Sequence, residues 1–365
     1  MRPSKQQQIL EIVERPHEPE RGFLAREFVV CTLPHRDPKK PTWVKSNGDF
    51  SLVLSSGVDK RGEFIGLPSG SIPKLLLFWF VTSAIKTQSR HIQLGDSLNG
   101  FLREVGLDPK TGGGKRGDAR RMKDELTKLV SCRISFIYEE GNQIRGSRTS
   151  RDMLLADNMV TWWDFANPEE RSILECHITL SEAFYEAATR NPVPFDFRAL
   201  VALKHSPLAI DLYTWSTWRV FAMVQHGEKQ ASVKIWGEGS LADQFGSQYG
   251  TSFHFKEALG EALAAVKAVW PQCDCELSAT RLTLKAAPVP IATTDKRQKK
   301  RAFSELKAAE VSMESRIWFM KEFPKHNART VIKAFKAFLS KNSITPHDVD
   351  ALFKDYAAKW VQGAE

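Results

Sequence analysis

The sequence contains no hydrophobic run long enough to cross a membrane. A membrane-spanning helix needs about 20 consecutive apolar residues, and the apolar stretches of this chain are much shorter. The N-terminal residues MRPSKQQQILEIVERPHEPE also lack the apolar segment of a secretory signal peptide. From these two absences we expect a cytoplasmic protein that has no membrane partner.

Cysteine is scarce and odd in number. The five residues are Cys31, Cys132, Cys176, Cys273 and Cys275. Most of them lie in apolar, strand-like patterns, which is typical of reduced core thiols rather than of a disulfide framework. Cys273 and Cys275 are separated by one residue instead of two, and there is no second pair. We therefore predict no structural zinc site and no other metal.

Two signatures of replication enzymes are also missing. GGGK at residues 112–115 is similar to part of a P-loop, but Pro109 stands where the motif needs glycine and Arg116 where it needs serine or threonine. The nine histidines never lie one residue apart, so the paired metal ligands of a nicking enzyme are absent. These departures argue against an ATPase and against a nicking enzyme.

Clustered carboxylates of a two-metal polymerase or primase site are not evident either. Glu139-Glu140 falls in an expected turn and Glu169-Glu170 lies beside a proline, and solvated side chains are expected at both places. No local signature of a serine or cysteine nucleophile is present. We predict no catalytic residues, no enzyme activity and no cofactor; a nuclease or primase with a dispersed site is the alternative.

What the sequence does have is an excess of positive charge. The formal net charge is +9 and the pI is about 9.2. Such a surface attracts polyanions, with nucleic acid and acidic membrane lipid as the leading candidates.

The positive charge is densest in KRGDARRMKDELTKLVSCRISFIY, residues 115–138. A helix starting near Asp118 would carry one apolar stripe, made of Met122, Leu126, Leu129 and Val130. The basic residues lie ahead of this helix or around its other sides: Lys115, Arg116, Arg120, Arg121, Lys123 and Lys128. A helix N-terminus favours anions, so the pattern predicts a phosphate-binding helix; a merely solvated charged helix is the alternative.

A hairpin is expected directly after the basic helix. Cys132–Tyr138 is rich in β-branched and aromatic residues, and Glu139–Asn142 has the composition of a turn. Two helices followed by a hairpin indicate a winged helix-turn-helix. We predict Arg120 and Arg121 near the major groove, Lys115, Arg116 and Lys128 at phosphates, and Arg145 or Arg148 on the wing.

The same order of elements occurs twice. In the first copy Ser71 begins a buried helix, residues 91–94 form a short strand, and Asp96 caps the helix that precedes the basic one. In the second copy the elements are a buried helix after Ser206-Pro207, a strand at 233–236, a helix capped by Ser240, a long helix over 253–270 and a hairpin over 273–285. Ser97-Leu98 matches Ser240-Leu241 and Cys132 matches Cys275, which indicates a tandem duplication.

The second long helix is less basic than the first. We predict that it reads bases through residues at its N-terminal end: Gln248, Tyr249, Thr251, Ser252, His254 and Lys256. The alternative is that this copy serves packing or partner binding.

The predicted fold class is α+β, with two tandem winged helix-turn-helix domains and a C-terminal helical appendage. We divide the chain into an N-terminal, partly extended arm (1–60), a first winged-helix domain (61–190), a second one (191–288), and a basic linker with the appendage (289–365). Residues 1–20 are expected to be flexible. The later part of the arm is basic at Arg36, Lys39, Lys40 and Lys45. The linker contains KRQKKR at 296–301, ahead of three helical patterns.

The string GLPSGSIPKLLLFWFVTSAIKTQSRHIQLGDSLNGFLREVGL, followed by TGGGKRGDARRMKDELTKLVSCRISF, resembles the plasmid-encoded RepA replication initiators. The resemblance runs from about Leu33 to Leu284. This family is similar in design to tandem winged-helix initiators that bind repeated origin sequences, called iterons. The resemblance implies a bacterial cytoplasmic protein that binds directly repeated double-stranded DNA in a plasmid origin. It also implies local opening of an AT-rich segment and recruitment of the host initiator and replicative helicase.

The resemblance further implies a homodimer through the first winged-helix domain, with dimers repressing the initiator's own promoter and contributing to plasmid copy control. The predicted function is therefore a plasmid replication initiator, and the alternative is a transcriptional (auto)repressor. Direct repeats in the target favour the initiator. A magnesium-dependent cleavage or synthesis product would favour the enzyme.

Overall fold

The computed structural model describes residues 4–15, 18–109, 117–141, 146–161, 163, 168–170, 176–291, 311, 313–324, 326–342 and 349–362. The chain divides into two compact units, Met1–Ile291, the main unit, and Ala292–Glu365, the helical tail. The described residues form thirteen helices and twelve strands, and the strands make four antiparallel sheets. The protein is thus a mixed α+β protein, as expected.

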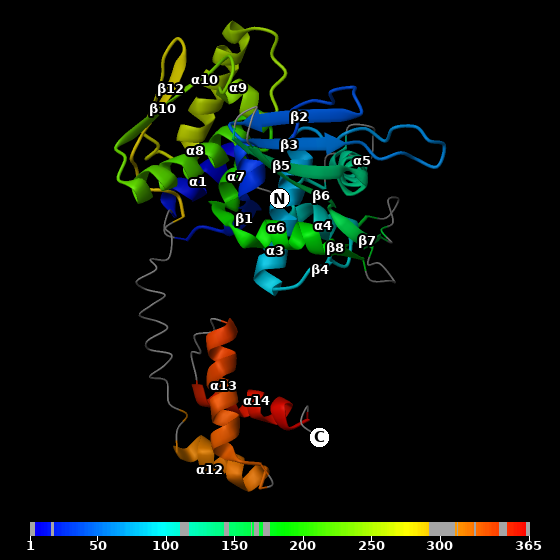
Figure 1. The fold of residues 1–365 in the computed structure, drawn as a ribbon, viewed down its shortest axis with the longest axis vertical. Coiled ribbons are helices and arrows are strands. Elements are labelled where there is room, and N and C mark those ends of the chain that lie inside the picture. Colours follow the sequence, from blue (N-terminus) through cyan, green and yellow to red (C-terminus); the bar gives the residue numbers. More distant parts are fainter. Residues whose placement is uncertain are drawn as a thin grey trace. The chain divides into compact units, whose positions relative to one another are not determined.

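Residues 71–180 form the N-terminal module (Figure 1). Its elements are α3 (Ser71–Thr87), β4 (His91–Gln93), α4 (Leu98–Glu104), α5 (Asp118–Ser131), β5 (Arg133–Gly141), β6 (Gly146–Leu154), β7 (Ala156–Val160) and β8 (His177–Leu180). Strand β4 pairs with β8, and β8 pairs with β7. Strands β5 and β6 join a second sheet, in the order β2-β3-β5-β6, with β2 (Thr42–Asn47) and β3 (Phe50–Ser55).

Residues 207–285 form the C-terminal module. Its elements are α8 (Pro207–His226), β10 (Gln230–Lys234), α9 (Leu241–Gln244), α10 (Ser252–Val269), β11 (Cys275–Leu277) and β12 (Arg281–Lys285). Its sheet has the order β10-β12-β11, which matches the order β4-β8-β7 of the N-terminal module. The predicted repetition of a buried helix, a strand and two helices is therefore confirmed, and the sheet order extends the match to tertiary structure. The predicted match of the hairpin directly after α5 with the β11–β12 hairpin, and with it the match of Cys132 with Cys275, is wrong, because β4 pairs with β8.

Local sequence explains both buried helices. Helix α3 is apolar on nearly all sides, as a helix covered on every face must be. Helix α8 starts at Pro207, is capped by the Ser206 hydroxyl, which accepts a hydrogen bond from the Ala209 N–H at 3.2 Å, and ends at Gly227 with φ +71°. Proline at the first turn and a left-handed glycine at the end are the usual helix limits.

The duplication begins earlier than the sequence shows. Helix α1 (Lys5–Glu14), strand β1 (Arg21–Ala25) and helix α2 (Arg26–Val30) precede the N-terminal module. Helix α6 (Glu182–Arg190), strand β9 (Pro192–Asp196) and helix α7 (Phe197–Ala202) precede the C-terminal module in the same order. The two equivalent strands, β1 and β9, pair with each other antiparallel, so the two halves of the main unit are joined through matching elements.

Several expectations about the first 60 residues are wrong. Residues 5–14 form a helix instead of a flexible segment, because Ser4 and Gln7 make a capping box and Ile12 is buried in the core. Strands β2 and β3 belong to the four-stranded sheet. Elsewhere, Ser97 rather than Asp96 caps α4, and Gly70 rather than Ser71 is the N-cap residue of α3.

The turn expected at Glu139–Asn142 also differs. Strand β5 continues to Gly141 and pairs with β6, with Glu139 opposite Arg148. Residues 142–145 lie outside the described residues. Two consecutive glutamates are poor strand formers, and pairing with β6 overrides that local preference.

One hydrophobic core extends through both modules. All five cysteines are buried free thiols, as predicted. Burial raises the pKa of Cys31 and of Cys132 to about 12, so neither is a thiolate at neutral pH. None of the described helices is long and apolar enough to span a bilayer.

The helical tail contains α12 (Met313–Glu322), α13 (Ala328–Asn342) and α14 (Val349–Gln362). These helices bury a small aromatic core of their own that includes Phe319, Phe335 and Phe353. Three helices are found where three helical patterns were predicted, but the start of the first pattern, near residue 303, lies outside the described residues. The basic run 296–301 lies outside them too.

Candidate nucleic-acid interface

Helix α5 presents cations on its solvent side. Met122, Leu126 and Leu129 are buried, which confirms the predicted apolar stripe, while Val130 is half-buried. The exposed charged residues of α5 are Arg120, Arg121, Lys123 and Asp124. Three exposed cations against one exposed carboxylate leave a net positive surface on this helix.

The other acidic residues of α5 are turned toward the protein. Asp118 accepts a hydrogen bond from the Asp108 N–H at 3.1 Å, and its carboxylate lies 3.6 Å from Arg121, which stays 56% exposed. Glu125 accepts hydrogen bonds from the Ser69 N–H at 2.7 Å and from Lys128 at 2.8 Å. Because the Lys128 side chain is only 19% exposed, it is the least accessible of the predicted phosphate contacts that the structure describes.

Three predicted residues, Lys115, Arg116 and Arg145, lie outside the described residues. Arg148 lies on β6, where its side chain is 65% exposed and its Nε is 3.3 Å from Glu139. This exposed ion pair is weak enough for a phosphate to replace it.

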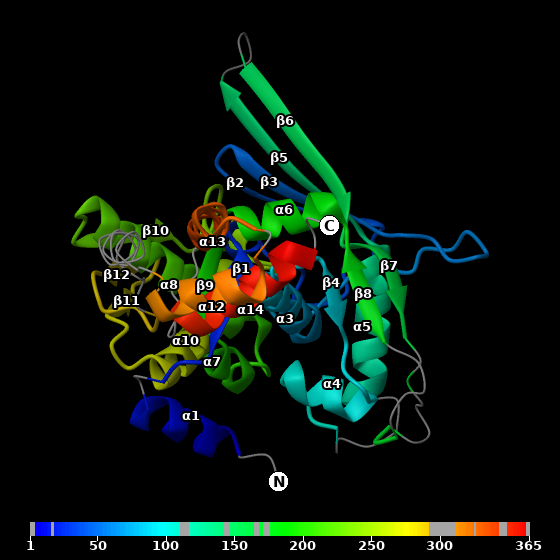
Figure 2. The same ribbon diagram turned by 90° about the horizontal axis from the view of Figure 1, so that it is seen from below.

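The hairpin that carries Arg148 is not the counterpart of the β11–β12 hairpin. Strand β4 pairs with β8 and not with β5 or β6, so the β7–β8 hairpin occupies the place that β11–β12 has in the C-terminal module. Figure 2 shows the β5–β6 hairpin projecting beyond the rest of the main unit. The sequence analysis matched the wrong hairpin to β11–β12 because β5 and β6 follow α5 directly, whereas strand pairing is decided over a longer stretch of chain.

Helix α10 exposes its N-terminal end. Thr251 caps the helix, its hydroxyl accepting a hydrogen bond from the His254 N–H at 3.4 Å. The predicted residues here lie together at one place: Gln248, Thr251, Ser252 and His254 are exposed, and Tyr249 and Lys256 are half-buried. An uncovered helix N-terminus with polar side chains is the geometry with which recognition helices contact base edges.

Phe253 is a residue of this surface that the sequence analysis missed. It is 69% exposed, although Phe255, two residues later, is fully buried. The helical period gives the signal: Phe255 and Leu259 share the inward stripe, and Phe253 falls outside it. An exposed phenylalanine beside the helix cap is suited to contact with a thymine methyl group.

Residues 32–35 lie against the turn between α9 and α10. The Thr32 N–H donates to Gln244 O at 3.1 Å, and the His35 N–H donates to Gly246 O at 2.7 Å. In return the Gly246 N–H donates to the Thr32 hydroxyl at 2.7 Å. A segment near the N-terminus thus holds the turn that positions α10.

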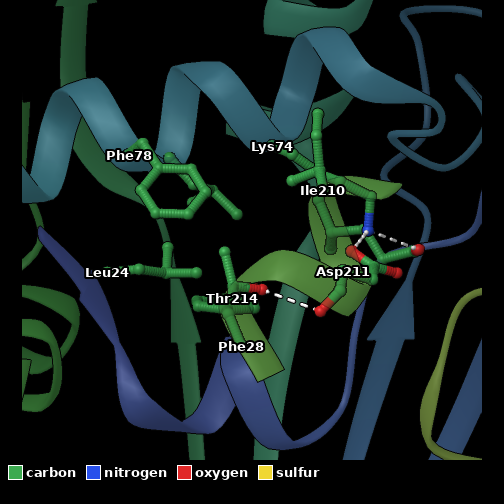
Figure 3. Close-up of a pocket in the computed structure, with 9 residues that line it drawn as sticks. Leu24, Phe28, Lys74, Phe78, Ile210, Asp211 and Thr214 are labelled. Carbon is green, nitrogen blue, oxygen red and sulfur yellow. Dashed lines mark hydrogen bonds and ion pairs between the residues drawn. The ribbon is translucent and has the colours of Figure 1, made fainter. Parts of the chain in front are cut away.

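A buried charge cluster centred on Asp211 joins the two modules (Figure 3). Lys74 of α3 donates to Asp211 of α8 at 2.6 Å and to Leu33 O at 3.1 Å. The Thr32 hydroxyl donates to the second carboxylate oxygen of Asp211, which also lies 2.7 Å from His35 Nε2. The Lys74 and Asp211 side chains are only 5% and 4% exposed. This cluster fixes α3, α8 and residues 32–35 to one another.

Burial and pairing set the charges of the cluster. Burial lowers the pKa of Lys74, against the attraction of Asp211. Burial alone would raise the pKa of Asp211, but Lys74 and His35 outweigh it and the pKa is lowered. Burial also lowers the pKa of His35, although the Asp211 carboxylate acts in the other direction. Asp211 is therefore an anion at neutral pH and His35 is neutral, donating its Nε2–H to the carboxylate.

We expect acid to weaken the main unit through His35. At pH values well above the ordinary imidazole pKa of 6.5, His35 is neutral in both the folded and the unfolded chain, so it does not make the free energy of unfolding depend on pH. As the pH falls below 6.5, the unfolded chain binds a proton that the folded chain does not, so stability is lost. The loss at about pH 5.5 is at most about 1.4 kcal/mol.

Urea unfolding of wild type and His35→Gln at about pH 7.5 and about pH 5.5 measures this loss. Glutamine keeps a hydrogen-bond donor for Asp211 but does not titrate. The free energy of unfolding of His35→Gln should therefore differ less between the two pH values than that of wild type. His226→Gln, at the exposed end of α8, is the control and should behave as wild type. An equal pH dependence in all three proteins would contradict the role of His35.

No group of three or more His, Cys, Asp or Glu residues that could hold a metal ion occurs in the described part of the chain. Residues 67–238 match the family model of the plasmid-encoded RepA protein. This region, a little under half of the chain, is similar to the plasmid-encoded RepA family. Comparisons with curated proteins and with solved structures gave no match.

The RepA match divides the candidate interface. It includes the whole N-terminal module, with α5, and continues through α8 and β10. It ends before α9 and α10. The match therefore includes α5, whereas the case for α10 rests on its exposed N-terminal end and on the matching sheet order.

Proposed function

We propose that this protein is a plasmid replication initiator that binds directly repeated double-stranded DNA in its origin, through two winged helix-turn-helix domains. The observation that carries the proposal is the repeated module. Each copy has a buried helix, a strand, two helices and a three-stranded sheet of the same order. Each also has a second helix with exposed polar or basic residues at its N-terminal end. The match of residues 67–238 to the plasmid-encoded RepA family supports the link to a plasmid.

The two modules present unlike surfaces, which favours direct over inverted repeats. Helix α5 exposes Arg120, Arg121 and Lys123, whereas the start of α10 exposes hydroxyl, amide, imidazole and phenyl groups. Because one chain carries two modules with different DNA-contacting surfaces, a monomer can cover one asymmetric sequence. Identical asymmetric sites in series then form direct repeats.

In this proposal the exposed cations of α5 provide affinity and part of the base reading. Arg120 and Arg121 lie near the major groove, and Lys115, Arg116 and Lys128 mainly neutralise phosphates. Either Arg145 or Arg148 approaches the adjacent groove, and Lys123 is a further DNA-binding residue of α5. Residues Gln248, Tyr249, Thr251, Ser252, His254 and Lys256 read the other half of the site. Phosphate contacts position the protein, and base contacts select the sequence.

The steps after binding are local opening of an AT-rich segment and recruitment of the host initiator and replicative helicase. They are binding functions and need no catalytic site, so the protein acts without enzyme activity. A homodimer through the N-terminal module would add repression of the protein's own promoter.

A nuclease footprint on the noncoding DNA that flanks the gene, at two salt concentrations, tests the proposal. Evenly spaced direct repeats that stay protected at the higher salt are the expected result. Protection of an inverted repeat alone at the promoter would replace the initiator with a repressor. Salt-sensitive protection without any pattern would show general phosphate binding and refute sequence-specific recognition.

Arg120→Ala is expected to weaken binding to the footprinted repeat by about 1 to 3 kcal/mol, if the guanidinium pairs with guanine in the major groove. Binding to random duplex should change much less. Arg61→Ala, in the exposed loop after β3, removes the same charged group away from α5 and is the control. Titrations on both duplexes measure the effect. An equal loss on the two duplexes would leave Arg120 as a phosphate contact only.

A further inference from the structure

Residues 36–40, Arg36-Asp37-Pro38-Lys39-Lys40, form a surface loop that we call the basic loop. Its start is fixed to the N-terminal end of α10, although more than 200 residues separate the two in sequence. The Gln248 side-chain amide donates to Arg36 O at 3.1 Å across a separation of 212 residues. The preceding residue, His35, donates its N–H to Gly246 O at 2.7 Å.

The backbone of the basic loop is held in one shape. Lys39 has φ +54°, a left-handed conformation that costs energy for a residue other than glycine. The Asp37 carboxylate stabilises this conformation by accepting the Lys39 N–H at 3.0 Å and the Lys39 ammonium at 3.0 Å. Pro38 and Pro41, which flank Lys39 and Lys40, restrict the backbone further. Strain held by local contacts on a surface is the kind of outlier that accompanies a binding role.

The charges of the basic loop point to an anionic partner. Arg36, Lys39 and Lys40 are all exposed. The only carboxylate of the loop, Asp37, is engaged by Lys39 at 3.0 Å, and this leaves Arg36 and Lys40 with an excess of two positive charges. Partial burial acts to raise the pKa of Asp37, but the hydrogen bonds from Lys39 outweigh it and the pKa is lowered. The ion pair therefore stays formed at neutral pH.

We propose that the basic loop binds the backbone phosphates beside the bases that α10 reads, with Arg36 and Lys40 as the contacts. The inference rests on the proposed function, because it takes α10 as a DNA-reading helix. The carbonyl of Arg36 accepts a hydrogen bond from the side chain of Gln248. The Arg36 side chain therefore starts within one side-chain length of any DNA that touches Gln248. The start of α10 exposes few cations of its own, and the basic loop supplies the phosphate contacts that this half of the site lacks.

This assignment explains why residues 32–36 are held so firmly against the α9–α10 turn. The hydrogen bonds between the α9–α10 turn and residues 32–36 fix the distance between the start of α10, which contacts bases, and the basic loop, which contacts phosphates. A fixed distance lets the phosphate contacts set the register of α10 on the duplex. The basic loop would then be a third contact region, added to the two modules by the N-terminal segment.

The test compares Arg36→Ala/Lys40→Ala with Lys60→Ala/Arg61→Ala. The control pair also removes one arginine and one lysine, from an exposed loop whose turn is likewise held by an aspartate, Asp59, through the Arg61 N–H at 2.8 Å. Binding is measured from about 50 to about 200 mM salt on a duplex with the footprinted repeat and on a scrambled duplex of equal length. Thermal unfolding confirms that each variant is folded.

Loss of two phosphate contacts should reduce the slope of log K against log salt by about 1.8 for Arg36→Ala/Lys40→Ala. The ratio of the wild-type binding constant to that of Arg36→Ala/Lys40→Ala should then decrease by about twelvefold from the lower to the higher salt concentration. The slope change should be the same on both duplexes, because phosphate contacts carry no sequence information. An unchanged slope, or the same change in the control pair, overturns the proposal.

The two proposals fail in different ways. If wild type shows no preference for the repeat, the proposed function fails, while the slopes on the scrambled duplex still decide whether the basic loop contacts phosphate. If wild type prefers the repeat and the Arg36→Ala/Lys40→Ala slope equals that of wild type, the basic loop proposal alone fails.

Discussion

Asp211→Ala is expected to lower the free energy of unfolding of the main unit by about 3 to 5 kcal/mol. The substitution leaves the Lys74 ammonium, only 5% exposed, without its carboxylate, and it removes the acceptor for Thr32 and His35. A buried charge without a partner costs far more than the loss of an exposed ion pair. The melting temperature should fall by roughly 10 °C. Urea unfolding followed by tryptophan fluorescence measures the change.

Two comparisons make the Asp211→Ala result specific. Asp157 is paired with Arg90 at 2.9 Å, but both side chains are about half exposed, at 54% and 44%. Asp157→Ala should therefore cost less than about 1 kcal/mol. Combining Asp211→Leu with Lys74→Met should recover part of the loss, because an apolar pair leaves no unpaired charge. A main unit that tolerates Asp211→Ala as easily as Asp157→Ala would show that the cluster does not hold the modules together.

Gly246→Ala is expected to destabilise the main unit by about 3 kcal/mol, the upper end of the usual cost of overpacking. A Cβ at this position would lie 1.7 Å from Leu33 O, 2.6 Å from Leu33 C and 2.9 Å from Pro34 Cα. These are backbone atoms, so no side-chain rotation relieves the overlap. The α9–α10 turn and residues 32–35 must separate, and the hydrogen bond from the His35 N–H to Gly246 O is lost with them.

Because the same contacts position α10 and the basic loop, Gly246→Ala should also weaken DNA binding by the folded variant. Gly250→Ala is a matched control four residues later, since a Cβ there would meet nothing within 4 Å. Urea unfolding and DNA titration of both variants measure whether only Gly246→Ala lowers the free energy of unfolding and the affinity for DNA. If Gly246→Ala matched Gly250→Ala in both measurements, the close approach of residues 32–35 to the turn would be excluded.

Much of the local structure could be predicted from sequence. The apolar spacing of Met122, Leu126 and Leu129 gave the inward face of α5, and Ser240 gave the start of α9. Helix periodicity and capping depend on neighbours within a few residues, so a single sequence contains the information. The order of elements, and hence the duplication, follows from that local information.

The pairing of distant residues could not be predicted in the same way. Lys74 and Asp211 each stand among apolar residues near the start of a buried helix, which was a signal that both needed a partner. They are 137 residues apart, and no local pattern joins them. The hairpin after α5 was wrongly matched to β11–β12 for the same reason, because β4 pairs with β8 and not with the nearer strands β5 and β6.

The sequence by itself determined the composition of the two modules, the basic face of α5 and the resemblance to the RepA family, because these depend on residues that are close along the chain. Only the tertiary structure decided that residues 32–36 lie on the α9–α10 turn, that Asp211 joins α3 to α8, and that Arg36 lies beside Gln248. Such contacts depend on which buried surfaces and strand edges meet when the whole main unit packs. That choice is made by the free energy of the complete core and not by any one segment.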